Sequence, residues 1–390
     1  MNYLDIPENE LLKKGALHTA SEIAGQPSLW RTTFETFNSQ SGSIFPFLET
    51  AYAQVDQIVL TGAGTSAYIG LSLQGIFSSR TRKIARAIAT TDILSYPSHY
   101  FQLDSVPLII SFARSGKSPE SCAALELADQ SCKKCFHLII TCNEGGALAN
   151  YSSKNPTCVF ILPEQANDKS LAMTGSYSAM LLTGLLIAFQ EDQAFCKTQL
   201  ELAIGSARNV LSEDIKTIRE IAETNFQRAV FLGSGLLYGT ATEAGLKLQE
   251  LTDGQIVCKS ETFLGFRHGP KAVIDETTLV VYFFSNNRHV SRYENDLLPA
   301  MKQGNTALFQ LGIAEHAIES DVPETQIVLL QENSTIAEEF LPLCSIVPAQ
   351  LLAFFKSLQL GLMPDAPSVS GSISRVVEGV NIYPVLSGQI

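Results

Sequence analysis

Two similar stretches of sequence decide the fold: QIVLTGAGTSAYIG at residues 57–70 and AVFLGSGLLYGT at residues 229–240. Each begins with an apolar run, turns at glycines and continues as a helical pattern, which is typical of a βα unit in a parallel sheet. Placing Gly62 on Gly233 gives an offset of 171 residues (233 − 62). The same offset relates two further pairs of apolar segments, 106–116 with 277–287 and 135–141 with 306–312. Repetition at one offset predicts two copies of one α/β domain.

Each copy contains five short apolar runs with helical stretches between them, which predicts a doubly wound, flavodoxin-like sheet. The runs lack polar alternation, as expected for parallel strands covered by helices on both faces. The fold class is therefore α/β, with two tandem three-layer αβα domains, each built on a five-stranded parallel sheet. The expected strands are 57–61, 84–88, 107–112, 137–141 and 158–161 in the first copy, and 229–232, 255–258, 278–284, 306–310 and 326–330 in the second.

The expected domain boundaries follow from these two copies. They divide the chain into four parts. These are a helical N-terminal extension carrying the only tryptophan, two α/β domains, and a Pro/Ser/Gly-rich C-terminal arm with a short final strand pattern. The ranges are 1–44, 45–205, 215–360 and 361–390.

The composition restricts the function. The 390 residues include 27 basic and 39 acidic side chains, for a net charge of −12, so nucleic acid and anionic membranes are disfavoured as partners. The N-terminus lacks a secretory pattern, and the longest apolar run, 179–189, is too short to span a bilayer and predicts a buried helix. Eight irregularly spaced cysteines indicate reduced thiols and a cytoplasmic location.

The first copy carries loops suited to phosphate. Glycines and hydroxyls follow the first strand in TGAGTS, a second loop reads SFARSGKSPE, and a third reads TGSYS. Backbone N–H groups at a helix N-terminus and nearby hydroxyls bind anions, and two such loops can meet at one sheet edge. Helix capping by the same serines and threonines is the alternative. The candidate residues are Gly64, Thr65, Ser66, Arg114, Ser115, Ser118, Thr174 and Ser176.

The sequence disfavours two cofactor sites. The pattern Gly62-x-Gly64-x-x-Ala67 fits a dinucleotide fingerprint, but the first acid after the second strand, Asp92, comes late, and the fingerprint does not require a hydroxyl-rich second loop. The sequence Cys132-Lys-Lys-Cys135-Phe-His137 resembles half of a zinc site, but no second half is present. We therefore expect structural cysteines, no NAD and no metal.

The second copy lacks the hydroxyls and carries Glu243, Lys247 and Glu250 on one helix face, at i, i+4 and i+7. A solvated salt-bridge ladder is the common meaning of this spacing. The segment that follows places His268 in a Gly-Pro turn, where a histidine is often only structural. A carboxylate and a histidine near a sugar phosphate are, however, the groups that ring opening and proton transfer between adjacent carbons require.

These motifs resemble the SIS (sugar isomerase) domain family, and they do so over essentially the whole chain. TGAGTSAY and SFARSGKSPES are similar to the phosphate loops of that family, and EAGLKLQE with FRHGPKAVID resembles the catalytic segment of the isomerase half of glucosamine-6-phosphate synthase. HTASEIAGQPSLW and PDAPSVSGSISRVVEGV resemble the branch described as tagatose-6-phosphate ketose/aldose isomerase or galactosamine-6-phosphate deaminase/isomerase.

The resemblance implies a role for each matching residue. Ser66, Ser115 and Ser118 would hold the phosphate, with backbone N–H groups around Arg114. Glu250 would be the base, His268 would open the ring, and Lys247 would steady the oxygen or the neighbouring carboxylate. The histidine of the family tends to reach into the partner subunit's site, which implies at least a homodimer.

The sequence also departs from the synthase pattern. Its second phosphate loop has Ala113-Arg114-Ser115 where the synthase has Ser-Gln-Ser, and the spacing from Glu250 to His268 is two residues longer. The synthase's C-terminal lysine has no clear match, although Arg375 or Ser372 stands near its place. No glutaminase domain accompanies the chain to supply ammonia, which favours deamination over amination.

The implied reaction is deamination of galactosamine 6-phosphate to tagatose 6-phosphate and ammonia without any cofactor. Two alternatives stay open at this point. One is aldose–ketose isomerisation of galactose or tagatose 6-phosphate by the same residues. The other is a sugar-phosphate sensor without catalysis, although the short, acidic N-terminal segment disfavours DNA binding.

Overall fold

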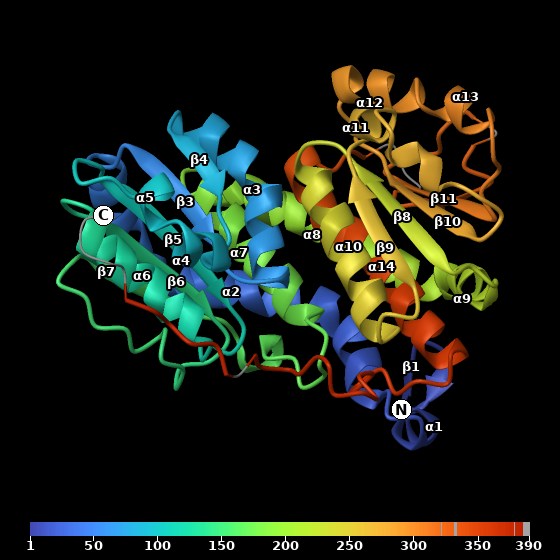
Figure 1. Cartoon of the computed structure of the whole chain (residues 1–390), viewed down its shortest axis with the longest axis horizontal. Coiled ribbons are helices and arrows are strands. Elements are labelled where there is room, and N and C mark those ends of the chain that lie inside the picture. The colour runs from blue at the N-terminus through green and yellow to red at the C-terminus, as the bar shows by residue number, and fades with distance from the viewer. Residues whose placement is uncertain (321, 331–333, 378, 385–390) are drawn as a thin grey trace. The chain divides into compact units, whose positions relative to one another are not determined.

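A computed structural model describes residues 1–320, 322–330, 334–377 and 379–384 (Figure 1). The chain divides into two compact units, each containing one sheet. The second-sheet unit comprises Met1–Ser28, Asp168–Thr174 and Lys197–Ser374. The first-sheet unit comprises Leu29–Asn167, Gly175–Cys196 and Arg375–Ile390.

The first-sheet unit is built on five parallel strands in the order β4-β3-β5-β6-β7. Every residue of β5 and β6 is buried, so helices must cover both faces of the sheet, as the absence of polar alternation predicts (Figure 1). The strands are β3 Gln57–Thr61, β4 Ile84–Ala87, β5 Pro107–Ala113, β6 Phe136–Thr141 and β7 Thr157–Ile161. The helices are α3 Thr65–Thr81, α4 Thr90–Ser95, α5 Pro97–Tyr100, α6 Pro119–Ser131, η1 Glu164–Ala166 and α7 Gly175–Ala188.

Helix packing in this unit depends on a glycine. Helix α7 contains most of the longest apolar run and is buried at every residue, which confirms the prediction of a buried helix. It packs against α3, where a Cβ atom on Gly184 would lie only 2.2 Å from Leu73 Cδ1. Val59 and Ile109 of the sheet belong to one buried apolar cluster with Leu125 of α6.

The second-sheet unit has the same strand order, β9-β8-β10-β11-β12, again all parallel. Its strands are β8 Arg228–Gly233, β9 Val257–Glu261, β10 Thr278–Phe283, β11 Phe309–Ala314 and β12 Thr325–Val328. The helices are α9 Ile215–Glu223, α10 Leu236–Leu251, α11 Phe263–Phe266, η3 Pro270–Val273, α12 Arg288–Asn295, α13 Leu298–Met301, η4 Glu338–Phe340 and α14 Leu341–Gln359. Helix α8 Gln193–Asn209 and the π-helix η2 Val210–Asp214 precede α9.

The N-terminal segment is mainly helical, as predicted. A small hairpin of β1 Asn2–Tyr3 and β2 Ile6–Pro7 comes first, then α1 Glu8–Lys13 and the long α2 Leu17–Tyr52. The indole of Trp30 is fully buried and donates a hydrogen bond to the hydroxyl of Ser178 on α7, at 2.8 Å. Helix α2 continues past residue 44, where the sequence analysis ended the extension.

The tandem αβα architecture is confirmed, and most strand positions agree with the prediction. The offset of 171 holds for β3 with β8 and for β5 with β10, but β9 and β11 begin two and three residues later than expected. The described residues 379–384 contain no strand, so the final strand pattern is not realised there, and residues 385–390 lie outside the described part. Among the described residues, one helical stretch, 338–359, is long and apolar enough to cross a membrane, but 94% of its apolar 18-residue window is buried in the protein.

Candidate functional site

The first hydroxyl-rich loop lies between β3 and α3. Gly64 adopts φ +55° directly before the helix, and a Cβ atom on Gly62 would come within 2.5 Å of the Ser66 side chain. Glycine is therefore required at both positions, for different reasons. The loop is fixed by Thr90, whose backbone N–H donates to the Gly62 carbonyl at 2.9 Å. Thr65 and Ser66, only 4% and 5% exposed, thus stand in the first turn of α3.

The second loop lies beside the first, because β5 pairs with β3 in parallel register and Ser111 is opposite Thr61. Ser118 precedes α6 without making a capping hydrogen bond; its hydroxyl pairs with that of Ser121 at 2.7 Å. Asn143 holds the turn by donating from its amide to the Ser115 carbonyl at 2.7 Å. Simple capping therefore does not account for Ser118.

The C-terminal arm is attached to this second loop. Arg114 is only 6% exposed, and its guanidinium donates to the backbone carbonyl of Arg375 at 2.5 Å. The Arg375 side chain in turn donates to Asn167 Oδ1 at 2.9 Å. Ser372 is exposed, and its hydroxyl pairs with that of Ser370. Of the two residues considered for the place of the missing lysine, Arg375 is thus the one that contacts a candidate phosphate loop.

The third candidate loop is less accessible. Thr174 and Ser176 are completely buried, and the Thr174 backbone N–H donates to Asp168 at 3.0 Å. A direct substrate contact by either hydroxyl stays a prediction.

The N-termini of α3 and α6 lie at the carboxyl edge of β3 and β5, together with hydroxyl and guanidinium donors. This arrangement is suited to a phosphate group.

In the second-sheet unit, α10 carries the buried charged set Glu243, Lys247 and Glu250. The Lys247 ammonium is fully buried, 2.5 Å from Glu250 Oε2 and 3.4 Å from Glu243 Oε1. Glu243 is also fully buried, whereas the Glu250 side chain is 23% exposed. A solvated ladder is therefore the wrong interpretation of this spacing. Lys247 lies between the two carboxylates and orients that of Glu250, which is the carboxylate of this set that reaches solvent.

His268 lies in the turn after α11 and is exposed. Its backbone N–H donates to the Gly265 carbonyl at 3.0 Å, and the next residue, Gly269, has φ +116°. Within the described residues, the imidazole forms no hydrogen bond or ion pair with Glu250. The turn thus presents a histidine side chain that the second-sheet unit itself does not use for structure.

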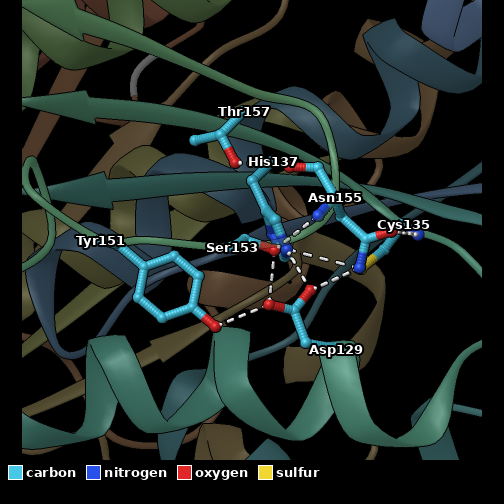
Figure 2. A network of polar contacts seen from close by, with 7 residues as sticks. All are labelled: Asp129, Cys135, His137, Tyr151, Ser153, Asn155 and Thr157. Atoms are coloured by element: carbon cyan, nitrogen blue, oxygen red, sulfur yellow. Dashed lines mark hydrogen bonds and ion pairs between the residues drawn. The ribbon is translucent and has the colours of Figure 1, made fainter.

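The cysteine and histidine cluster is organised by a residue that the sequence analysis missed. Asp129, near the end of α6, accepts hydrogen bonds from five side chains (Figure 2). Burial alone would raise the pKa of Asp129, but these hydrogen bonds lower it well below its usual value. The donors and distances are His137 Nε2 at 2.8 Å, Cys135 Sγ at 3.0 Å, Tyr151 Oη at 2.7 Å, Ser153 Oγ at 2.6 Å and Asn155 Nδ2 at 2.8 Å.

This cluster offers one ligand atom each from Asp129, Cys135 and His137, all within 4.8 Å of one another. Burial and the nearby carboxylate raise the pKa of Cys135, which favours the thiol that donates a hydrogen bond over the thiolate that binds a metal. A hydrogen-bond network therefore accounts for these groups. The spacing of Asp129, eight residues before His137, was the only signal in the sequence.

Comparisons with known proteins agree with this geometry. A family model for the SIS domain matches residues 51–189. A protein of Shewanella sp. (strain ANA-3), named D-galactosamine-6-phosphate deaminase AgaS, is 41% identical over 96% of this chain and 94% of that protein. The Escherichia coli protein of the same name is 36% identical over 94% of this chain and 95% of its own length.

Among solved structures, a protein of Clostridium novyi NT described as a tagatose-6-phosphate ketose/aldose isomerase superposes with a TM-score of 0.95 at 39% identity, covering 99% of this chain and all of that one. The chain therefore belongs to the SIS-domain family. Within the family, its similarity extends over nearly the full length of the AgaS proteins.

Proposed function

We propose that this protein is a deaminase/isomerase that converts galactosamine 6-phosphate to tagatose 6-phosphate and ammonia. The observation that carries the proposal is the buried Glu243–Lys247–Glu250 set, in which only the Glu250 carboxylate reaches solvent. Relatives named galactosamine-6-phosphate deaminase match almost the whole chain, which supports the choice of substrate.

In the proposed mechanism, the loops after β3 and β5 bind the phosphate through Ser66, Ser115 and Ser118, with Arg114 beside them. His268 promotes opening of the sugar ring. Glu250 then removes the C2 proton and returns it at C1, while a second proton passes from the amino nitrogen to O1. The aldehyde thereby becomes a hydroxymethyl group and C2 becomes an imine. Water adds to the imine carbon, and ammonia leaves as the 2-ketose forms.

The residues around Glu250 suit a proton shuttle. Lys247 keeps the carboxylate oriented through the 2.5 Å contact with Glu250 Oε2, and the ammonium itself is fully buried. Hydrogen-bond donors and a carboxylate suffice for an enol-type intermediate, so the proposal includes no metal or redox cofactor.

Glu250→Gln tests the base. We expect kcat to fall at least ~1,000-fold, since general-base catalysis typically contributes 10²–10⁴-fold, with little change in sugar-phosphate affinity. Glu276→Gln, at an exposed position of the same unit, is the matched control and should leave kcat unchanged. Retained activity in Glu250→Gln would remove this residue from the role of base.

Ammonia release from galactosamine 6-phosphate tests the reaction, with glucosamine 6-phosphate measured alongside and tagatose 6-phosphate tested for isomerisation. Ammonia from the galacto sugar alone is the expected result. Ketose–aldose exchange without ammonia would favour the plain isomerase, the activity in the name of the Clostridium novyi protein. Binding without any turnover would instead favour a sensor.

We further propose a homodimer in the cytoplasm. The family resemblance supports the dimer, and eight cysteines without a disulfide support a reducing compartment. Light scattering of the purified chain would test the dimer; a monomer at all concentrations would contradict it.

A further inference from the structure

The second candidate phosphate loop contacts the segment that follows β6, residues 143–148, which we call the supporting segment. The Asn143 side chain donates to the Ser115 carbonyl at 2.7 Å. The Leu148 backbone N–H donates to the Gly116 carbonyl at 2.9 Å. Two successive carbonyl groups of the loop are therefore bonded to one neighbouring segment, and neither peptide group can rotate without breaking a hydrogen bond.

The supporting segment fits closely against the loop. A Cβ atom on Gly146 would lie 2.8 Å from the Ser115 carbonyl oxygen and 3.1 Å from that of Gly116. Asn143 Oδ1 accepts from the Gly145 backbone N–H at 3.2 Å, so both ends of the Asn143 side-chain amide are bonded. The orientation of this amide is therefore fixed where it meets the loop.

These contacts determine which way the donors of the loop point. Within a trans peptide group the N–H points away from the carbonyl, so a carbonyl bonded to the supporting segment turns the following N–H away from that segment. The N–H that follows the Ser115 carbonyl is that of Gly116, which donates to no acceptor among the described residues. The Lys117 N–H donates to Ser115 Oγ at 3.3 Å, so the Ser115 hydroxyl keeps its own proton for a ligand.

The second sheet differs at this point. The offset of 171 residues places Asn286 at the position of Ser115. There the chain after β11 provides an acceptor, Glu315 Oε2, which lies 3.0 Å from the side-chain nitrogen of Asn286. The donor amide thus accompanies the sheet that is proposed to bind the phosphate, and a carboxylate, which would repel an anion, accompanies the other.

We propose that Asn143 is a positioning residue for the phosphate of the substrate. It acts through the Ser115 carbonyl: the hydrogen bond orients the peptide group so that the Ser115 hydroxyl and the Gly116 N–H donate to phosphate oxygens. The inference rests on the proposed function, in which the loop after β5 binds the phosphate. It makes the supporting segment a determinant of the preference for phosphorylated sugars.

Asn143→Ala tests the hydrogen bond. We expect the KM for galactosamine 6-phosphate to rise about 10-fold with kcat within about twofold of wild type, because an interaction remote from the reacting carbons contributes equally to the binding of substrate and transition state. Asn150→Ala is the matched control. The Asn150 amide donates to the carbonyls of Glu144 and Gly146, at 2.8 and 2.9 Å, within the supporting segment itself. This variant should change the KM less than about twofold.

Gly146→Ala tests the same support with Asn143 intact. Its methyl group would press on the Ser115 carbonyl, and we expect the KM to rise about 3–10-fold. Gly145→Ala is the control, because a Cβ atom there would meet only Asn143 Oδ1, at an ordinary 3.6 Å. If Asn143→Ala does not fold, as judged by circular dichroism, the two glycine variants decide the question.

Calorimetric titration with inorganic phosphate, at about 0.15 M ionic strength, measures the loop without catalysis. Asn143→Ala should bind phosphate about 10-fold more weakly than wild type, and Asn150→Ala should bind it within about twofold of wild type.

Equal phosphate affinities of Asn143→Ala and Asn150→Ala would overturn the proposal. A fall in kcat at unchanged KM would also overturn it, as would a wild-type chain that binds no phosphate. Failure of the proposed function gives a different result: the wild-type chain would release no ammonia from galactosamine 6-phosphate, while the phosphate titration would still separate the two asparagine variants.

Discussion

The loops after β3 and β5 and the loops after β8 and β10 have similar backbones but different chemistry. Gly64 and Gly235, before α3 and α10, share φ +55°, with ψ −128° and −120°. After this common turn, the first sheet continues with Thr65 and Ser66, and the second continues with Leu236 and Leu237.

The second loops differ further. Where the first sheet has Arg114 and Ser115, the second has Ser285 and Asn286. The Ser285 backbone N–H donates to Glu294 Oε2 at 2.9 Å, and its hydroxyl donates to Glu338. Asn287 also donates to Glu338, at 3.1 Å. In the second sheet, the protein's own carboxylates thus engage donors at the position where the first sheet is proposed to bind a phosphate.

The comparison shows that one fold carries two different sets of side chains at the same sheet edge. The first sheet keeps hydroxyl and guanidinium groups there, and the second sheet satisfies its donors internally and carries the buried charged set of α10 instead. The variants below test this division, starting with the largest expected effect.

Ser66→Leu gives the first loop the apolar character of its counterpart, Leu237. We expect the KM for the sugar phosphate to rise about 100-fold, because a hydroxyl and the space beside the helix N-terminus are both lost. Steady-state kinetics would show this, with thermal unfolding as the control for folding. A KM within threefold of wild type would contradict a phosphate role for this loop.

Asp129→Asn tests a feature that only the first sheet has. The offset of 171 residues between the two copies places Ala300 at the position of Asp129, so the second sheet has no acid there. The amide accepts less strongly and lacks the charge that five donors stabilise, so we expect the free energy of unfolding to fall by about 2–4 kcal/mol at pH 7. Because the pKa of Asp129 is lowered, its stabilisation should be present above about pH 4 and lost as the pH falls further.

Urea unfolding of wild type and variant at several pH values would measure this difference. Asp104→Asn, at an exposed position of the same unit, is the control and should change stability by less than about 0.5 kcal/mol. If the free energies of unfolding of Asp129→Asn and wild type differ by the same amount down to pH 3, the five donors are not held by an ionised Asp129.

Glu294→Gln probes the internal carboxylate of the second sheet. Burial raises the pKa of Glu294 from 4.5 to about 7, and Glu338 nearby adds to the rise. The folded state therefore holds this proton more tightly than the unfolded state, and stability from this group falls as the pH rises from about 4.5 to 7. The variant removes that cost, so it should gain about 1–3 kcal/mol relative to wild type between pH 5 and pH 8.

Leu236→Thr restores one hydroxyl to the second sheet at the counterpart of Thr65. We expect no measurable change in sugar-phosphate affinity or stoichiometry, because donors of the neighbouring loop are already paired with Glu294 and Glu338. A new binding site in calorimetry would show that the missing hydroxyl alone separates the two sheets.

Much of this division could be predicted from the sequence. The strands at the centre of each sheet are continuous apolar runs, so β5 and β10 were located to within a residue. The edge strand β9, VCKSE, has exposed and half-buried residues, and its polar sequence explains why its position was displaced.

The candidate site was less predictable because spacing does not reveal burial. The i, i+4, i+7 pattern placed Glu243, Lys247 and Glu250 on one helix face, but only packing decides that this face is buried. Asp129 and Glu294 were missed for a related reason. Each is an acid in a helix with no sequence pattern to set it apart, and its partners come from segments that meet only in the folded chain.

The single tryptophan has a practical consequence for all unfolding measurements. Its indole is buried in the first-sheet unit, where it is bonded to Ser178 of α7, and the second-sheet unit contains no other such fluorophore. Tryptophan fluorescence excited at the red edge of the absorption band therefore reports the unfolding of the first-sheet unit and not that of the second-sheet unit. A fluorescence trace that precedes or follows the circular-dichroism trace would resolve the two units without any label.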